Sequence, residues 1–175
     1  MRRQCGDCQL CCKLLPVRSL AKPGGKRCDH QSFSVGCKIY HKLAQVSPEC
    51  AVWNCRWLVN DDCADVRRPD RGGYVIDILP DFVRARDDAS GQEQNWEAVQ
   101  VWVDHPDAVD DPGLQAYLIR RAHEGKVAII RTSPRTGYVL IAPPMATDGK
   151  WHKTDNGPTE RTHTPMEIME ALANR

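Results

Sequence analysis

Cysteine is missing from residues 64–175, although the chain of 175 residues contains nine. The sequence also lacks an apolar run that approaches the roughly 18 residues of a membrane-spanning helix, so we expect none. No phosphate-binding loop, dinucleotide-binding glycine motif, HExxH motif or nucleophile elbow occurs, and we therefore assign no catalytic residue. The formal net charge is only +1, which gives no argument for nucleic acid as a partner.

The N-terminus begins with basic residues but lacks the apolar stretch of a secretory signal. We therefore expect a cytoplasmic protein, in a compartment that keeps thiols reduced. Clustered cysteines in such a protein are more typical of metal ligands or redox thiols than of disulfides. The odd number of cysteines agrees with this, because a closed disulfide framework would leave one thiol over. A metal ion is thus the expected binding partner.

The spacing of the cysteines supports metal binding. All nine lie between Cys5 and Cys63, and the first four form a C-x2-C-x2-C-C run that ends at Cys12. Two-residue spacings let two thiolates reach one metal from one turn of chain, and C-x2-C-x2-C runs also gather the ligands of iron–sulfur clusters. Adjacent cysteines point at one site less easily, so either Cys11 and Cys12 serve two sites or one packs as a small hydrophobe.

Three further residues are weaker ligand candidates. His30 follows Cys28 by two positions, but a lone histidine is more often a surface or hydrogen-bonded residue. His41 is a weaker candidate still. Cys63 lies in an acidic loop, and we predict that it does not bind metal.

The segment Ser47-Pro48-Glu49 has the features of a helix start. On a regular helix from this point, Cys50, Trp53 and Trp57 would share one face, with the tryptophans in the core. Cys55 would then lie about 140° from Cys50. Either the helix is irregular there or the two thiols face different partners.

Positive charge is concentrated around the cysteines. Residues 1–63 carry ten Lys and Arg against five Asp and Glu, whereas residues 64–175 carry fourteen against eighteen. Nearby cations favour the thiolate form that binds metal. A basic, solvated surface would explain the excess equally well, so the charge alone does not decide.

The sequence predicts an α+β fold in two parts. Residues 1–63 form a small helical and loop cysteine-rich metal module, and residues 64–175 form a cysteine-free α+β region packed on it, with a polar junction near residues 60–73. We expect a small mixed or antiparallel sheet with covering helices in the second part. The predicted strands are Tyr74–Leu79, Phe82–Arg86, Trp96–Val103, Val127–Arg131 and Tyr138–Ala142, with a turn at Pro80-Asp81 and a hairpin joining the last two. Predicted helices begin after Asp111 and Thr164.

The order of the cysteines and their neighbours resembles a bacterial family. The matching segments are Cys5-Gly-Asp-Cys8-Gln-Leu-Cys11-Cys12, Lys22-Pro-Gly-Gly, Cys28-Asp-His30, Gly36-Cys37-Lys-Ile-Tyr40 and Cys50-x4-Cys55-Arg-Trp-Leu58. They cover roughly residues 4–59 and resemble the CxxCxxCC family, also called the YkgJ-type family, of zinc- or iron-chelating domains. The resemblance implies a metal site built from eight cysteines: Cys5, Cys8, Cys11, Cys12, Cys28, Cys37, Cys50 and Cys55.

The function expected from these observations is the binding of zinc or of an iron–sulfur cluster. Two four-thiolate zinc sites would use all eight cysteines, whereas one cubane cluster would use four. A related cysteine domain in flagellin lysine methylases adds to the iron–sulfur possibility. Two alternatives remain: an iron–sulfur-dependent redox or transferase enzyme, and a module in which zinc shapes a surface for a protein partner.

Overall fold

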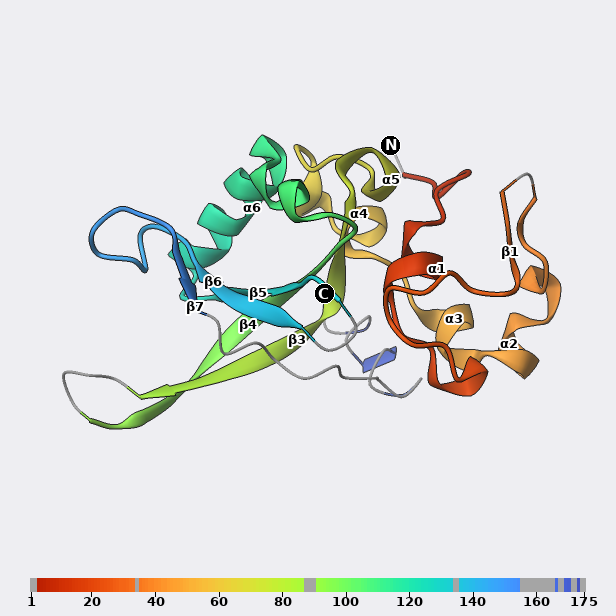
Figure 1. Cartoon of the computed structure of the whole chain (residues 1–175), viewed down its shortest axis with the longest axis horizontal. Coiled ribbons are helices and arrows are strands. Elements are labelled where there is room, and N and C mark those ends of the chain that lie inside the picture. The colour runs from red at the N-terminus through yellow and green to blue at the C-terminus, as the bar shows by residue number, and fades with distance from the viewer. Residues whose placement is uncertain are drawn as a thin grey trace.

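The chain folds into helices and a mixed β-sheet, as Figure 1 shows for the computed structural model. The structure describes residues 3–33, 35–86, 91–133 and 136–154, with Met166, Met169, Glu170 and Ala173 near the end of the chain. The predicted α+β class is confirmed. The start of the helix predicted after Thr164 lies outside the described residues. Among the helices that are described, none combines the length and the apolar character needed to cross a membrane.

The cysteine-rich region is built from short elements. Its α-helices are α1 (Leu10–Leu14), α2 (Leu43–Val46), α3 (Pro48–Val52) and α4 (Arg56–Val59), and its 3-10 helices are η1 (Arg18–Leu20), η2 (Tyr40–Lys42) and η3 (Asp61–Cys63). Strands β1 (Gln31–Ser32) and β2 (Gly36–Cys37) pair antiparallel. Isolated helices of this length are unstable in water, so contacts between side chains must hold this region in shape.

A five-stranded sheet dominates the second region, in the order β3-β4-β5-β6-β7. Its strands are β3 (Tyr74–Arg86), β4 (Glu93–Val103), β5 (Val127–Arg131), β6 (Gly137–Ile141) and β7 (His152–Thr154). Strands β4 and β5 are parallel and the other neighbours are antiparallel. A parallel pair needs a crossover, which η4 (Pro106–Asp110) and α6 (Pro112–His123) supply. The short helix α5 (Pro69–Gly72) leads into β3. The predicted hairpin of β5 and β6 is confirmed.

Helix α6 begins where the sequence predicts. The Asp111 carboxylate accepts a hydrogen bond of 3.0 Å from the Leu114 N–H and caps the helix, and Pro112 takes the first helical position. The Tyr74 hydroxyl donates a second hydrogen bond of 3.0 Å to the same carboxylate oxygen. One buried aspartate therefore both starts the crossover helix and ties it to β3.

The prediction of two strands separated by a turn at Pro80-Asp81 is wrong. The structure has one long strand, β3, whose pairing with β4 shifts register between Ile76 and Pro80. At this irregularity the Asp77 carboxylate accepts hydrogen bonds from the Leu79 N–H and from the Trp53 indole N–H, at 3.2 and 3.1 Å. A β-bulge accommodates the irregular residues and lets the strand continue.

One face of the sheet packs against α6. Ile76, Val101 and Ile130 of strands β3, β4 and β5 form a buried cluster with Leu114 and Tyr117 of the helix. The helix covers this face in Figure 1. The alternating pattern of β4 predicts this burial of apolar side chains.

The other face receives the cysteine-rich region. Val75 and Trp102 form a second buried cluster with Leu14 of α1 and with Cys55. Strand β4 thus has apolar contacts on both faces, as its sequence predicts. The thiol of Cys55 consequently lies where the cysteine-rich region meets the sheet.

A helix begins after Ser47, as predicted, but it does not continue regularly. Helix α3 ends at Val52, residues 53–55 are not helical, and α4 begins at Arg56. Trp53 and Cys55 both have extended backbones, and the Trp53 indole reaches Asp77 of β3. Contact with the sheet therefore overrides the local helical preference. The helix is thus irregular, which is one of the two alternatives that the sequence left open.

Candidate metal centre

All nine cysteines are free thiols in the structure. Cys5 is exposed, Cys55 and Cys63 are buried, and the other six are partly buried. The eight cysteines expected to bind metal divide into two groups, according to which sulfurs lie close enough to affect one another electrostatically. We define group one as Cys5, Cys8, Cys11 and Cys55, and group two as Cys12, Cys28, Cys37 and Cys50.

Group one lies beside the sheet. The pKa of Cys55 is raised to about 12, chiefly by burial and to a smaller extent by the nearby thiols of Cys5 and Cys8. Cys5 and Cys55 also raise the pKa of Cys11, after the larger effects of a hydrogen bond to Cys12 and of burial. Burial similarly raises the pKa of Cys8, with Cys5 adding to the effect. Four thiols from the N-terminal loop, α1 and the start of α4 therefore share one neighbourhood.

Group two takes its thiols from α1, the loop before β1, strand β2 and helix α3. Burial raises the pKa of Cys37, and Cys12 and Cys28 raise it further. Burial likewise raises the pKa of Cys50, again with added contributions from Cys12 and Cys28. The Cys28 N–H also donates to the Cys12 carbonyl at 3.1 Å, so the backbone itself holds these two residues together.

The two groups meet at Cys11 and Cys12. The Cys11 thiol hydrogen-bonds to the Cys12 sulfur, which raises the pKa of Cys11 well above its usual value. The same hydrogen bond, with help from the Lys22 charge, lowers the pKa of Cys12 to about 7 although burial opposes it. Cys12 also raises the pKa of Cys5, so the two groups adjoin each other.

Backbone and hydroxyl groups donate hydrogen bonds to several of these sulfurs. The Leu10 and Asp70 N–H groups reach Cys8, and the Ile39 N–H reaches Cys37. The Leu58 N–H reaches Cys55, and the Ser47 hydroxyl reaches Cys50. Each bond favours the thiolate and opposes the effect of burial. Donors of this kind suit sulfurs that must carry negative charge, as metal ligands do.

Arg68 fixes the loop that carries Cys5 and Cys8. Its guanidinium contacts both oxygens of Asp70, at 2.6 and 2.7 Å, and forms an ion pair of 2.9 Å with Asp7. Asp7 lies between the two cysteines, and the Asp70 N–H donates to the Cys8 sulfur. Group one is therefore held from outside by residues that follow the last cysteine of the chain.

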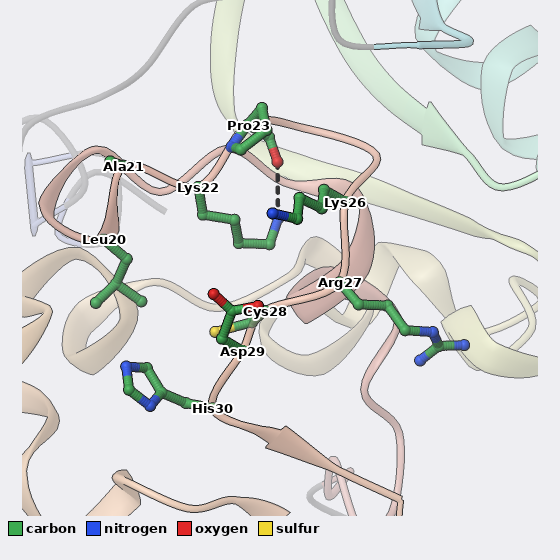
Figure 2. Close-up of a pocket in the computed structure, with 9 residues that line it drawn as sticks. All are labelled: Leu20, Ala21, Lys22, Pro23, Lys26, Arg27, Cys28, Asp29 and His30. Atoms are coloured by element: carbon green, nitrogen blue, oxygen red, sulfur yellow. Dashed lines mark hydrogen bonds between the residues drawn. The ribbon is translucent and has the colours of Figure 1, made fainter.

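Lys22 lies beside group two and is buried. Its ammonium donates to the backbone carbonyls of Lys13, Leu15 and Pro23. Figure 2 shows the bond to Pro23 and places Lys22 above Cys28 in a small cavity. Neither Lys22 nor Arg68 was among the site residues predicted from the sequence. The Lys22-Pro-Gly-Gly segment of the family resemblance was the one signal for Lys22, because nothing in a lone lysine indicates burial.

The three weaker candidates lie in different places. Cys63 is fully buried in the main core cluster with Tyr117, and burial raises its pKa to about 12. His30 lines the cavity beside Cys28 (Figure 2), and His41 is exposed. Cys63 therefore packs as a core residue.

The donor set fits a thiophilic metal in its chemistry. Zinc and iron–sulfur clusters both take four thiolates, and each group contains four thiols with hydrogen-bond donors nearby. The arrangement is looser than a coordination site: within the described ranges, no three His, Cys, Asp or Glu side chains are disposed so that they could hold one metal ion. The groups are neighbourhoods of thiols, and a metal would have to draw their sulfurs together.

Comparison with models of known protein families, with curated proteins and with solved structures gives no match for this chain. The resemblance to the CxxCxxCC family therefore stays a prediction that rests on the residues quoted for it. The division of the eight cysteines into two groups rests on which sulfurs affect the pKa of one another.

Proposed function

We propose that this protein binds metal through eight cysteines, in two centres of four thiolates each. The observation that carries the proposal is the separation of the cysteines into group one and group two, with Cys11 and Cys12 assigned to different groups. Four thiols per group equal the ligand number of a structural zinc site.

Zinc is the metal we propose first. A four-thiolate zinc site needs no inorganic sulfide and no second component, and it would stabilise a region that has only short helices and a two-stranded hairpin. The binding free energy of such a metal adds to the stability of the folded state. An iron–sulfur cluster in each group is the alternative, because a cubane also takes four thiolates.

Metal binding would require changes in the thiols. Burial keeps the pKa of Cys8, Cys37, Cys50 and Cys55 above that of an ordinary thiol, so these groups hold their protons at neutral pH without metal. Binding then releases protons and brings the sulfurs of one group together. The N–H and hydroxyl donors already directed at four of the sulfurs would stabilise the thiolates. Such chemistry suits a reducing compartment, and we propose the cytoplasm.

Elemental analysis of protein purified without oxygen, combined with an absorption spectrum, tests this function. Colourless protein with about two zinc ions per chain supports the zinc form. Brown protein that absorbs near 400 nm and contains iron and sulfide supports the cluster form and contradicts the zinc form. Protein that holds neither metal, with its cysteines paired after growth under reducing conditions, contradicts both.

A further inference from the structure

Lys22 combines three features that rarely occur together in a lysine. Only 8% of the residue is exposed. Its ammonium contacts the carbonyl oxygens of Lys13 and Pro23 at 3.2 and 3.1 Å, and it also donates to the Leu15 carbonyl. Lysines are almost never buried without a paired charge. In the part of the chain that the structure describes, however, no carboxylate forms an ion pair with Lys22.

The three carbonyl partners fix both the position and the charge of this side chain. An ammonium has three hydrogens and can donate to all three oxygens, whereas a neutral amine has only two. Lys13 follows Cys12 within α1, and Leu15 is the first residue after that helix. The cation is therefore tied to the same helix that carries a group-two thiol, and it cannot swing into solvent without losing all three bonds.

Lys22 lies near the group-two cysteines: it lines one small cavity with Cys28, and it donates to the carbonyl of Lys13, the residue that follows Cys12. Burial lowers the pKa of Lys22, and the nearby thiols of Cys28, Cys12, Cys50 and Cys11 oppose this, in decreasing order. Three of these four belong to group two. Thiolates of group two that hold a metal would therefore lie close to this ammonium.

We propose that Lys22 is the built-in counter-charge of group two and strengthens the binding of metal there. This inference rests on the proposed function. Four thiolates around a divalent metal carry a net charge of −2, and a fixed cation nearby in a poorly solvated site stabilises that charge. Lysine acts here as a point charge that positions no ligand and touches no metal.

The role predicts a division between the two groups. The Arg68 charge acts on Cys5 of group one, whereas Lys22 is a buried cation beside group two. Loss of the Lys22 charge should therefore weaken metal binding by group two and leave group one unchanged. If Lys22 only held the loop in place, losing its charge and changing its hydrogen bonds would affect metal binding alike.

Zinc affinity measured by competition with a coloured chelator, on reduced full-length protein, tests this inference. The measurements use two backgrounds, Cys5→Ala with Cys55→Ala, in which only group two is complete, and Cys28→Ala with Cys50→Ala, in which only group one is complete. Lys22→Gln keeps two N–H donors and removes the charge, Lys22→Arg keeps the charge, and Lys42→Met removes an exposed lysine as a control.

In the group-two background, we expect Lys22→Gln to lose at least tenfold in zinc affinity, and Lys22→Arg and Lys42→Met to stay within about threefold. In the group-one background, all three should match the parent protein. Equal affinities for Lys22→Gln and the parent in the group-two background would overturn the role of Lys22, as would an equal loss in Lys22→Gln and Lys22→Arg. Protein with native Lys22 that binds no zinc in either background would instead overturn the proposed function itself, and with it this role.

Discussion

Cys11 and Cys12 are adjacent in the chain and hydrogen-bonded to each other, yet they belong to different thiol groups. Cys11 has Cys5 and Cys55 as neighbours, whereas Cys12 is a neighbour of Cys37 and Cys50. Adjacent residues on a helix point about 100° apart, so one turn of α1 can serve both groups. The pair is the place where the two proposed centres meet.

Paired substitutions should therefore remove one metal centre at a time. Replacing Cys5 and Cys55 with alanine should halve the metal content of the purified protein, because group one then has two ligands. Replacing Cys28 and Cys50 should halve it as well, through group two. Cys63→Ala is the control: it removes a core thiol and should leave the metal content unchanged. Complete metal loss in either pair would contradict two separate centres.

Arg68 should matter for group one only. Arg68→Gln breaks the contacts to Asp7 and Asp70 that hold the Cys5–Cys8 loop, so we expect metal to leave group one several-fold faster. Arg71 is a matched control, because its side chain is 75% exposed and approaches Asp70 only to 4.0 Å. The rate of metal transfer to a chelator measures the effect. Equal rates of metal transfer from the Arg68→Gln and Arg71→Gln variants would contradict this role of Arg68.

Gly113 should resist substitution, although it lies in a helix. Alanine usually stabilises a helix by about 0.5–1 kcal/mol relative to glycine. Here a Cβ atom at Gly113 would lie 2.5 Å from the Asp65 carbonyl oxygen, which is backbone and cannot rotate away. We expect Gly113→Ala to lower the free energy of unfolding by about 1–3 kcal/mol, measured by urea denaturation. A stabilised variant would show that α6 does not pack on Asp65 as described.

The ion pair of Asp65 with Arg120 should give a small pH-dependent stability. A hydrogen bond from Arg120 lowers the pKa of Asp65, so the contribution is present above the pKa of an unfolded aspartate, about 3.9. It is lost as the pH falls through the lower folded pKa. Both side chains are more than a third exposed, and such pairs contribute about 0.2–1 kcal/mol.

Asp65→Asn measures this contribution. The variant should be less stable than the parent to urea at pH 6, and the difference should shrink as the pH is lowered toward 2. A difference that is the same at both pH values would mean that the charge of Asp65 contributes nothing.

Much of the sheet region could be predicted from the sequence, because its signals are local. The alternation in β4, the Asp111 cap and the two strands of the β5–β6 hairpin each depend on residues close together in the chain. The continuity of β3 could not be predicted. It depends on a β-bulge and on Trp53, which lies outside that strand and reaches Asp77.

The cysteines were predicted as a set, but their division into groups was not. Cys55 lies near Cys5 and Cys8 only because helix α3 ends at Val52 and the chain that follows packs against the sheet. The burial of Lys22 likewise comes from three backbone carbonyls that its own sequence position does not indicate. Long-range packing decides both features, so local patterns carry no trace of them.

The mass of the intact native protein, purified without oxygen and measured by native mass spectrometry, tests the central claim most directly. Two centres predict a mass above that of the 19.7 kDa chain by two zinc ions or two clusters, less the protons released. The excess should fall to one centre in each of the two paired cysteine variants. A mass equal to that of the bare reduced chain, or a single centre that persists in both paired variants, would contradict the account.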